Sequence, residues 1–141
     1  MAQQVIGQGP GNLVPDSETK SFLANGAIVK GDVVGLLVGS LPMTGYTVDQ
    51  CSATIQAIGV AAESGTDVWI DVVVSGFCDF VTNDGTDVVA GDYLLGAAGV
   101  AQPGTIAELE ADASDIIQVF GQSLSEQTGT TCTEVIIFKR I

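Results

Sequence analysis

Hydrophobic and polar residues alternate with a period of two through the middle of the chain, most regularly over residues 68–74. One side of the alternation carries Trp69, Asp71 and Val73. The other side carries only branched apolar residues: Val68, Ile70, Val72 and Val74. A period of two is typical of a β-strand, whose successive side chains point to opposite faces. With glycine-containing turn signals on both sides, the pattern predicts a central strand here and a short strand over residues 77–82.

Shorter segments of the same kind recur along the chain between turn residues. They predict strands over residues 33–38, 46–49, 53–61, 93–95, 116–124 and 133–139. The strongest turn signal is Asn-Asp-Gly at residues 83–85, which is typical of a hairpin, and a polar turn is expected at residues 128–131. Only residues 102–114 favour a helix, because Thr105 and Glu108 have the spacing of a capping box. A long loop is the alternative for that segment.

The composition supports an all-β fold. The chain has 141 residues, enough for one domain with its own hydrophobic core, and 46% of them are hydrophobic. Only 15% are charged and 18 are glycines, so many turns and few stable helices are expected.

Residues 1–26 differ from the rest of the chain. Glycine and proline interrupt them repeatedly, and their apolar residues come in isolated pairs such as Leu13-Val14 and Phe22-Leu23. A floppy terminus is one interpretation. We favour an extended N-terminal arm whose spaced apolar residues order against a neighbouring subunit or a partner. The single β domain is then expected to cover residues 27–141.

A weak internal repeat divides this domain into two similar halves. The matching segments, in order, are 31–35 with 91–96, 58–63 with 120–126, and 68–74 with 132–138. Their order and spacing agree, which favours two similar β units that each turn at a Gly-Asp corner and pack against each other. The alternative is coincidence, since Gly-Asp turns are common before valine-rich strands.

Charge limits the possible partners. Four basic residues oppose 17 acidic ones, for a formal net charge of -13. Such a chain repels phosphate backbones and anionic lipid, so neither nucleic acid nor membrane is an expected partner. The sequence shows no basic leader and no long apolar run, which predicts a protein made and kept in the cytosol. Three widely spaced cysteines, at positions 51, 78 and 132, are expected to be reduced and buried, although one disulfide is possible.

No catalytic or cofactor site is predicted. The chain has no histidine, which removes Ser-His-Asp and Cys-His machinery and histidine-based zinc sites. The glycine-rich residues 7–11 do not complete a phosphate-binding loop, and residues 83–87 lack the closing glutamate of a calcium loop. The carboxylates between residues 108 and 115 are expected to lie in solvent. We therefore predict no enzyme activity, no cofactor and no metal.

Trp69 is the one tryptophan of the chain, on the strand face opposite Ile70 and Val72. Two interpretations are open. Either both faces of the strand are covered within a barrel, or Trp69 anchors a contact with another subunit.

The order of five motifs resembles the small capsid decoration, or cement, proteins of tailed bacteriophages, including a group of phage proteins mislabelled as recombinase-like. The motifs are Lys30-Gly31-Asp32-Val33-Val34, Ile58-Gly59-Val60-Ala61, residues 68–76, Ala90-Gly91-Asp92-Tyr93-Leu94 and Phe120-Gly121-Gln122-Ser123-Leu124. The similarity extends over about residues 27–138.

The resemblance implies a compact, tulip-like β-barrel domain that assembles as a homotrimer on the outer capsid surface of the virion and clamps neighbouring major capsid proteins. Residues 1–26 would be the arm. The candidate capsid or intersubunit contacts are Leu13, Val14, Phe22, Leu23 and Trp69. The resemblance implies no catalytic residue.

Two other functions are considered. A phage tail or receptor-binding β module has the same kind of composition. A trimeric β enzyme that hydrolyses nucleotides would need basic phosphate contacts, and the four basic residues are too few and too scattered to favour it.

Overall fold

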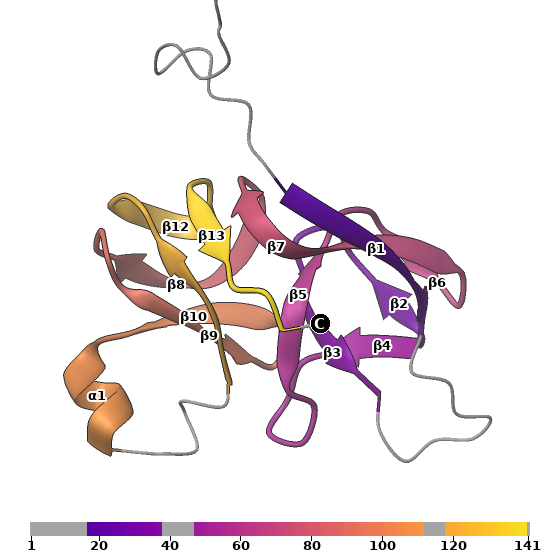
Figure 1. Ribbon diagram of the computed structural model, residues 1–141, viewed down its shortest axis with the longest axis horizontal. Helices are drawn as coiled ribbons and strands as arrows, with labels where there is room; N and C mark the ends of the chain where they lie inside the picture. Colours follow the sequence, from indigo (N-terminus) through magenta and orange to yellow (C-terminus); the bar gives the residue numbers. More distant parts are fainter. Residues whose placement is uncertain (1–16, 38–46, 112–117, 141) are drawn as a thin grey trace, which may run out of the picture.

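The computed structural model describes residues 17–37, 47–111 and 118–140, which are almost entirely β structure (Figure 1). The strands are β1 (Ser17–Ala24), β2 (Ala27–Ile28), β3 (Val33–Leu36), β4 (Thr47–Gln50), β5 (Ala57–Ala61), β6 (Gly65–Thr66), β7 (Trp69–Cys78), β8 (Val81–Val88), β9 (Tyr93–Ala97), β10 (Val100–Gly104), β11 (Val119–Ser123), β12 (Gln127–Cys132) and β13 (Val135–Ile137). A short helix, α1 (Ile106–Ala111), accompanies them. The predicted all-β class is confirmed.

The first half of the chain closes into a five-stranded barrel. Its strands follow the order β1, β4, β3, β5 and β7, and β7 pairs back with β1 to complete the ring. Alternate residues of these strands point inward and form one buried cluster, which includes Phe22, Val34, Val48, Ile58 and Ile70. Because the ring is closed, none of its five strands leaves a long unpaired edge.

The second half repeats this connectivity. Strands β8, β10, β9 and β11 pair in the same order and with the same directions as β1, β4, β3 and β5. The counterpart of β7 is divided in two, because β12 pairs with β8 whereas β13 pairs with β11. The two similar halves predicted from the sequence are therefore confirmed.

The repeat extends to individual hydrogen bonds. In the first half the Gly31 amide donates to the Ala61 carbonyl and the Ala61 amide to the Asp32 carbonyl. In the second half the Gly91 amide donates to the Ser123 carbonyl and the Ser123 amide to the Asp92 carbonyl. Each corner aspartate also accepts from the amide three residues earlier, at 2.9 Å in both halves.

The hydrogen bonds correct one part of the predicted repeat. The Ala62 amide donates to the Asp71 backbone carbonyl, and the equivalent Leu124 amide donates to the Glu134 backbone carbonyl. Residues 68–74 therefore correspond to residues 131–137, one position earlier than the sequence comparison placed them. Local similarity between two valine-rich strands does not fix their register, whereas the hydrogen bonds do.

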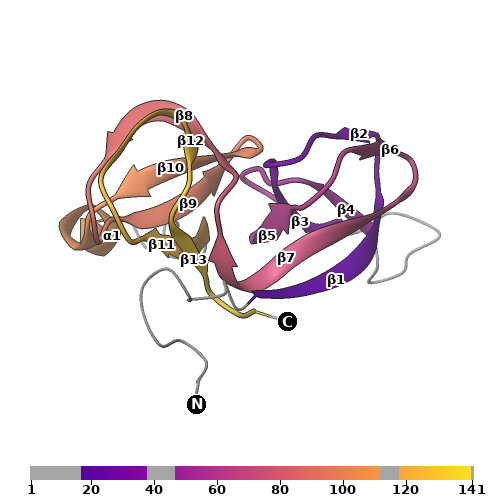
Figure 2. The ribbon, with the colours of Figure 1, turned by 90° about the horizontal axis from the view of Figure 1, so that it is seen from above.

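β7 joins the two halves. Its first part pairs with β1 and β5, and its last three residues pair with β13. In Figure 2 the halves lie side by side, with β7 running from one to the other. The outward-facing Val33, Val60 and Val73 of the first barrel belong to the buried cluster of the second half. Strands β3 and β5, and β7 at Val73, therefore bury both faces, one inside the barrel and one against the second half.

The β domain begins earlier than predicted. Residues 17–24 were expected in the arm, but they form β1, which pairs with β7 from Ser17↔Gly76 to Leu23↔Trp69. Phe22 and Ala24 are 4% and 2% exposed inside the barrel. This expectation was wrong because residues 22 and 23 lie in one strand and point to its two opposite faces, so they do not form an isolated apolar pair in an arm. The remaining arm positions, residues 1–16, lie outside the described residues.

Two predicted turns are part of a strand pair instead. Residues 83–85 lie within β8 and residues 128–131 within β12, and Gly85 pairs with Gly129. Both glycines have positive φ, 99° and 93°, and the register shifts on either side of Gly129. The Asn-Asp-Gly segment therefore bends a continuing strand rather than reversing the chain.

The predicted capping box is confirmed at the start of α1. The Glu108 amide donates to Thr105 Oγ1 at 3.3 Å, and the Thr105 amide donates to Glu108 Oε2 at 2.7 Å. The segment is therefore helical over six residues.

Candidate functional site

An apolar pair, the half-buried Leu23 and the exposed Trp69, lies on the outer face of the first barrel. Leu23 of β1 stands directly opposite Trp69 of β7, with Thr47 of β4 beside Leu23. Their sequence neighbours Phe22, Val48 and Ile70 point into the barrel and are buried. Trp69 is 57% exposed and the adjacent Val68 is 50% exposed. Strand alternation thus places a large apolar side chain on the outside because its neighbours fill the inside.

Acidic side chains lie on the strands of this pair, on β4 and on the segments that adjoin them. Asp71 accepts from Ser21 Oγ at 2.9 Å, and Asp49 accepts from Asn25 Nδ2 at 2.9 Å. Asp67 accepts from the Gly26 amide at 2.8 Å. Glu63 accepts from the Asp71 amide at 2.9 Å. We call this surface the Trp69 face: Leu23 and Trp69, with the carboxylates Asp49, Glu63, Asp67 and Asp71.

The donors to these four carboxylates are neutral groups. Within the described residues, the salt bridges join Glu18 to Lys20 at 3.6 Å and Glu18 to Lys139 at 3.1 Å. The pKa of Glu18 is lowered, chiefly by its hydrogen bond with Lys139. Lys30 places its ammonium 4.7 Å from the centre of the Phe80 ring, and Arg140 donates to the Val119 carbonyl. The four basic side chains therefore contact groups other than the rim of the Trp69 face.

The structure places the contact residues predicted from the sequence in different environments. It brings Leu23 and Trp69 together, and it buries Phe22 inside the barrel, so Phe22 stabilises the fold and offers no contact surface. Leu13 and Val14 lie outside the described residues. Trp69 is 57% exposed, so the described residues do not cover both faces of β7 at this position.

Sequence reasoning missed the acidic rim. Its members come from β4, from the segment after β5 and from both sides of the start of β7, so no local spacing relates them. The one available signal was that Asp71 shares a strand face with Trp69.

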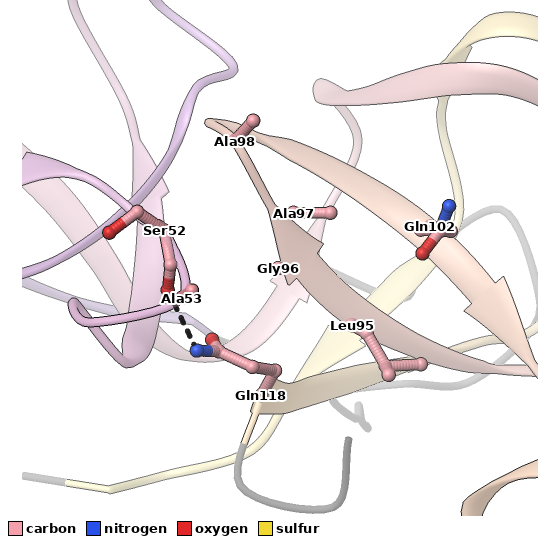
Figure 3. Close-up of a pocket in the computed structure, with 8 residues that line it drawn as sticks. All are labelled: Ser52, Ala53, Leu95, Gly96, Ala97, Ala98, Gln102 and Gln118. Carbon is pink, nitrogen blue, oxygen red and sulfur yellow. Dashed lines mark hydrogen bonds between the residues drawn. The ribbon is translucent and has the colours of Figure 1, made fainter. Parts of the chain in front are cut away.

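A surface depression of about 430 Å³ lies where the two halves meet (Figure 3). Ser52 and Ala53 line one side, and Leu95, Gly96, Ala97, Ala98 and Gln102 line the other. Gln118 bridges them, because its Nε2 donates to the Ser52 carbonyl at 2.9 Å and its Oε1 accepts from the Ala57 amide at 3.2 Å. Gln102 donates to Asp84 at 3.2 Å. The amides that line the depression therefore hold protein segments together.

The described residues contain no group of three potential metal ligands from histidine, cysteine, aspartate and glutamate. All three cysteines are free thiols and are buried. Burial raises the pKa of Cys51 and of Cys78 to about 11, which keeps these thiols protonated near neutral pH. In the same part of the chain, no helix has the length and apolar character needed to cross a bilayer.

The fold is shared with a phage protein. The head fiber gp8.5 N base of bacteriophage phi29 superimposes with a TM-score of 0.58 at 17% sequence identity. The similarity covers 87% of this chain and 95% of that one. No protein-family model and no curated protein sequence matches the chain. At this identity the similarity establishes the fold.

Proposed function

We propose that the protein is a bacteriophage capsid decoration (cement) protein, which binds the outer surface of the assembled head as a homotrimer and stabilises it by clamping neighbouring major capsid proteins. The observation that supports this proposal most is the structural similarity to a head fiber base, because it covers nearly the whole of both chains. The order of motifs in the sequence suggests the same class independently.

The physical properties of the chain suit this role. The first barrel is closed and is fused to a second, similar half, so its strands leave no long exposed edge. The net charge of -13 opposes nonspecific association between free trimers in solution. On a capsid, repeated sites hold a trimer by several contacts at once, so weak individual contacts add up to stable binding. A protein that binds only the assembled shell stabilises that shell by mass action.

The test is cosedimentation of the purified chain with phage heads that lack it, combined with light scattering of the free protein. We expect saturable binding, and a mass three times that of one chain. Decorated heads should also withstand higher temperature or lower salt than undecorated heads. A monomer that does not bind heads would contradict the proposal. Binding of such a monomer to host cells would instead support the tail or receptor-binding alternative.

A further inference from the structure

We propose that the Trp69 face binds a basic protein surface that has an apolar recess for the indole ring. This inference rests on the proposed function, in which that surface belongs to the major capsid protein. An exposed tryptophan lies beside Leu23, and the polar Ser21–Asp71 pair is two residues along the same strands, which fits an interface with an apolar centre and a polar rim. Tryptophan is also among the residues that contribute most to binding at such centres.

The charge of the rim decides which partner fits. Asp49, Glu63, Asp67 and Asp71 accept hydrogen bonds only from neutral donors in the described residues. The basic side chains contact Glu18, the Phe80 ring and the Val119 carbonyl instead. A partner that supplies lysine or arginine around an apolar recess would gain charge-assisted hydrogen bonds with these carboxylates.

A second copy of the chain fits this face poorly. Two Trp69 faces placed together would bring eight carboxylates into one interface, since each face carries four. Like charges in an interface oppose association. A heterologous contact would need a basic patch on the other copy, and Lys20 and Lys139 are already paired with Glu18. The favoured occupant is therefore a different, basic protein.

The experiment compares variants of the full-length chain in binding to phage heads that lack the protein. Trp69→Ala should weaken binding by about tenfold or more, which is the effect typical of a central interface residue. Val89→Ala is the matched control, because Val89 is also 57% exposed but lies in the second half. It should leave affinity unchanged. Hydroxyl-radical footprinting should show that Trp69 becomes protected on heads.

Charge is tested separately. Asp49→Asn combined with Asp71→Asn keeps both hydrogen-bond acceptors but removes two rim charges. We expect weaker binding and a smaller loss of affinity as salt rises, because fewer interfacial charges remain to be screened. Asp79→Asn combined with Asp87→Asn removes two exposed charges elsewhere and serves as the control.

The outcomes separate the two proposals. If the wild-type protein binds heads but Trp69→Ala binds equally well, this inference is wrong and the decoration function stands. If Trp69→Ala lowers the mass of the free protein, the face is a contact between copies and the inference is also wrong. If the wild-type protein does not bind heads, the decoration function fails, and this inference fails with it.

Discussion

At the scale of residues, the close approach of two strands explains why glycine occupies the same place in both halves. Gly59 of β5 and Gly121 of β11 precede the equivalent positions Val60 and Gln122. A Cβ on Gly59 would lie 2.2 Å from the Val73 carbonyl oxygen, and one on Gly121 would lie 2.5 Å from the Ile136 carbonyl oxygen. Neither distance is sterically possible, so any side chain must push backbone apart.

Gly59→Ala and Gly121→Ala are therefore both expected to lower the free energy of unfolding, by about 1–3 kcal/mol each, as overpacking usually does. The measurement is urea denaturation followed by circular dichroism. Thr130→Ala, in an exposed part of β12, is the control and should change the free energy of unfolding by less than about 0.5 kcal/mol. Unchanged stability in both glycine variants would show that the strands do not approach as closely as described.

At the scale of elements, β1 decides where the stable domain begins. It closes the first barrel by pairing with both β4 and β7, and it places Phe22 and Ala24 in the core. Glu18 at its start also contacts Lys139 near the end of the described chain, at 3.1 Å. Removing β1 would expose one edge each of β4 and β7 and open the barrel interior to water.

Two truncations test this boundary. Deletion of residues 1–16 should leave the melting temperature nearly unchanged, because it keeps all of β1. Deletion of residues 1–26 should unfold the first barrel or cause aggregation through its open edges. Thermal melting and size-exclusion chromatography distinguish the two results. A folded, monodisperse protein without residues 1–26 would restore the boundary predicted from the sequence. Only the shorter deletion is suited to testing whether the arm binds heads.

At the scale of the whole molecule, the two halves share structure that couples their stability. β7 contributes to both, and Val33, Val60 and Val73 of the first barrel lie in the core cluster of the second half. Unfolding of either half would expose buried apolar surface of the other half to water. We therefore expect the duplicated fold to unfold as one cooperative unit despite its two interiors.

We expect a single unfolding transition in urea, with coincident midpoints from different probes. Tryptophan fluorescence reports the first barrel, since Trp69 is the one tryptophan of the chain. Far-ultraviolet circular dichroism reports strands of both halves. Coincident curves would support coupling through β7, whereas separated midpoints would show that the halves unfold independently.

Local pattern was enough to predict much of this architecture. The period of two identified the central strand, and the repeated Gly-Asp corners identified the two halves, because alternation and turn chemistry are written in neighbouring residues. The low charged content and the many glycines indicated β structure. The net negative charge could also be counted directly from the residues. The capping box at Thr105 also followed from a fixed local spacing.

Only the tertiary structure decided which strands pair and which side chains come together on their outer faces. Residues 17–24 became a barrel strand because β7 and β4 were available to pair with them, not because of any signal within those residues. The Asn-Asp-Gly segment continued a strand because Gly129 lies opposite Gly85. Leu23, Trp69 and the carboxylates around them came together through ring closure. Such contacts depend on the register between distant segments, which periodicity along the chain does not specify.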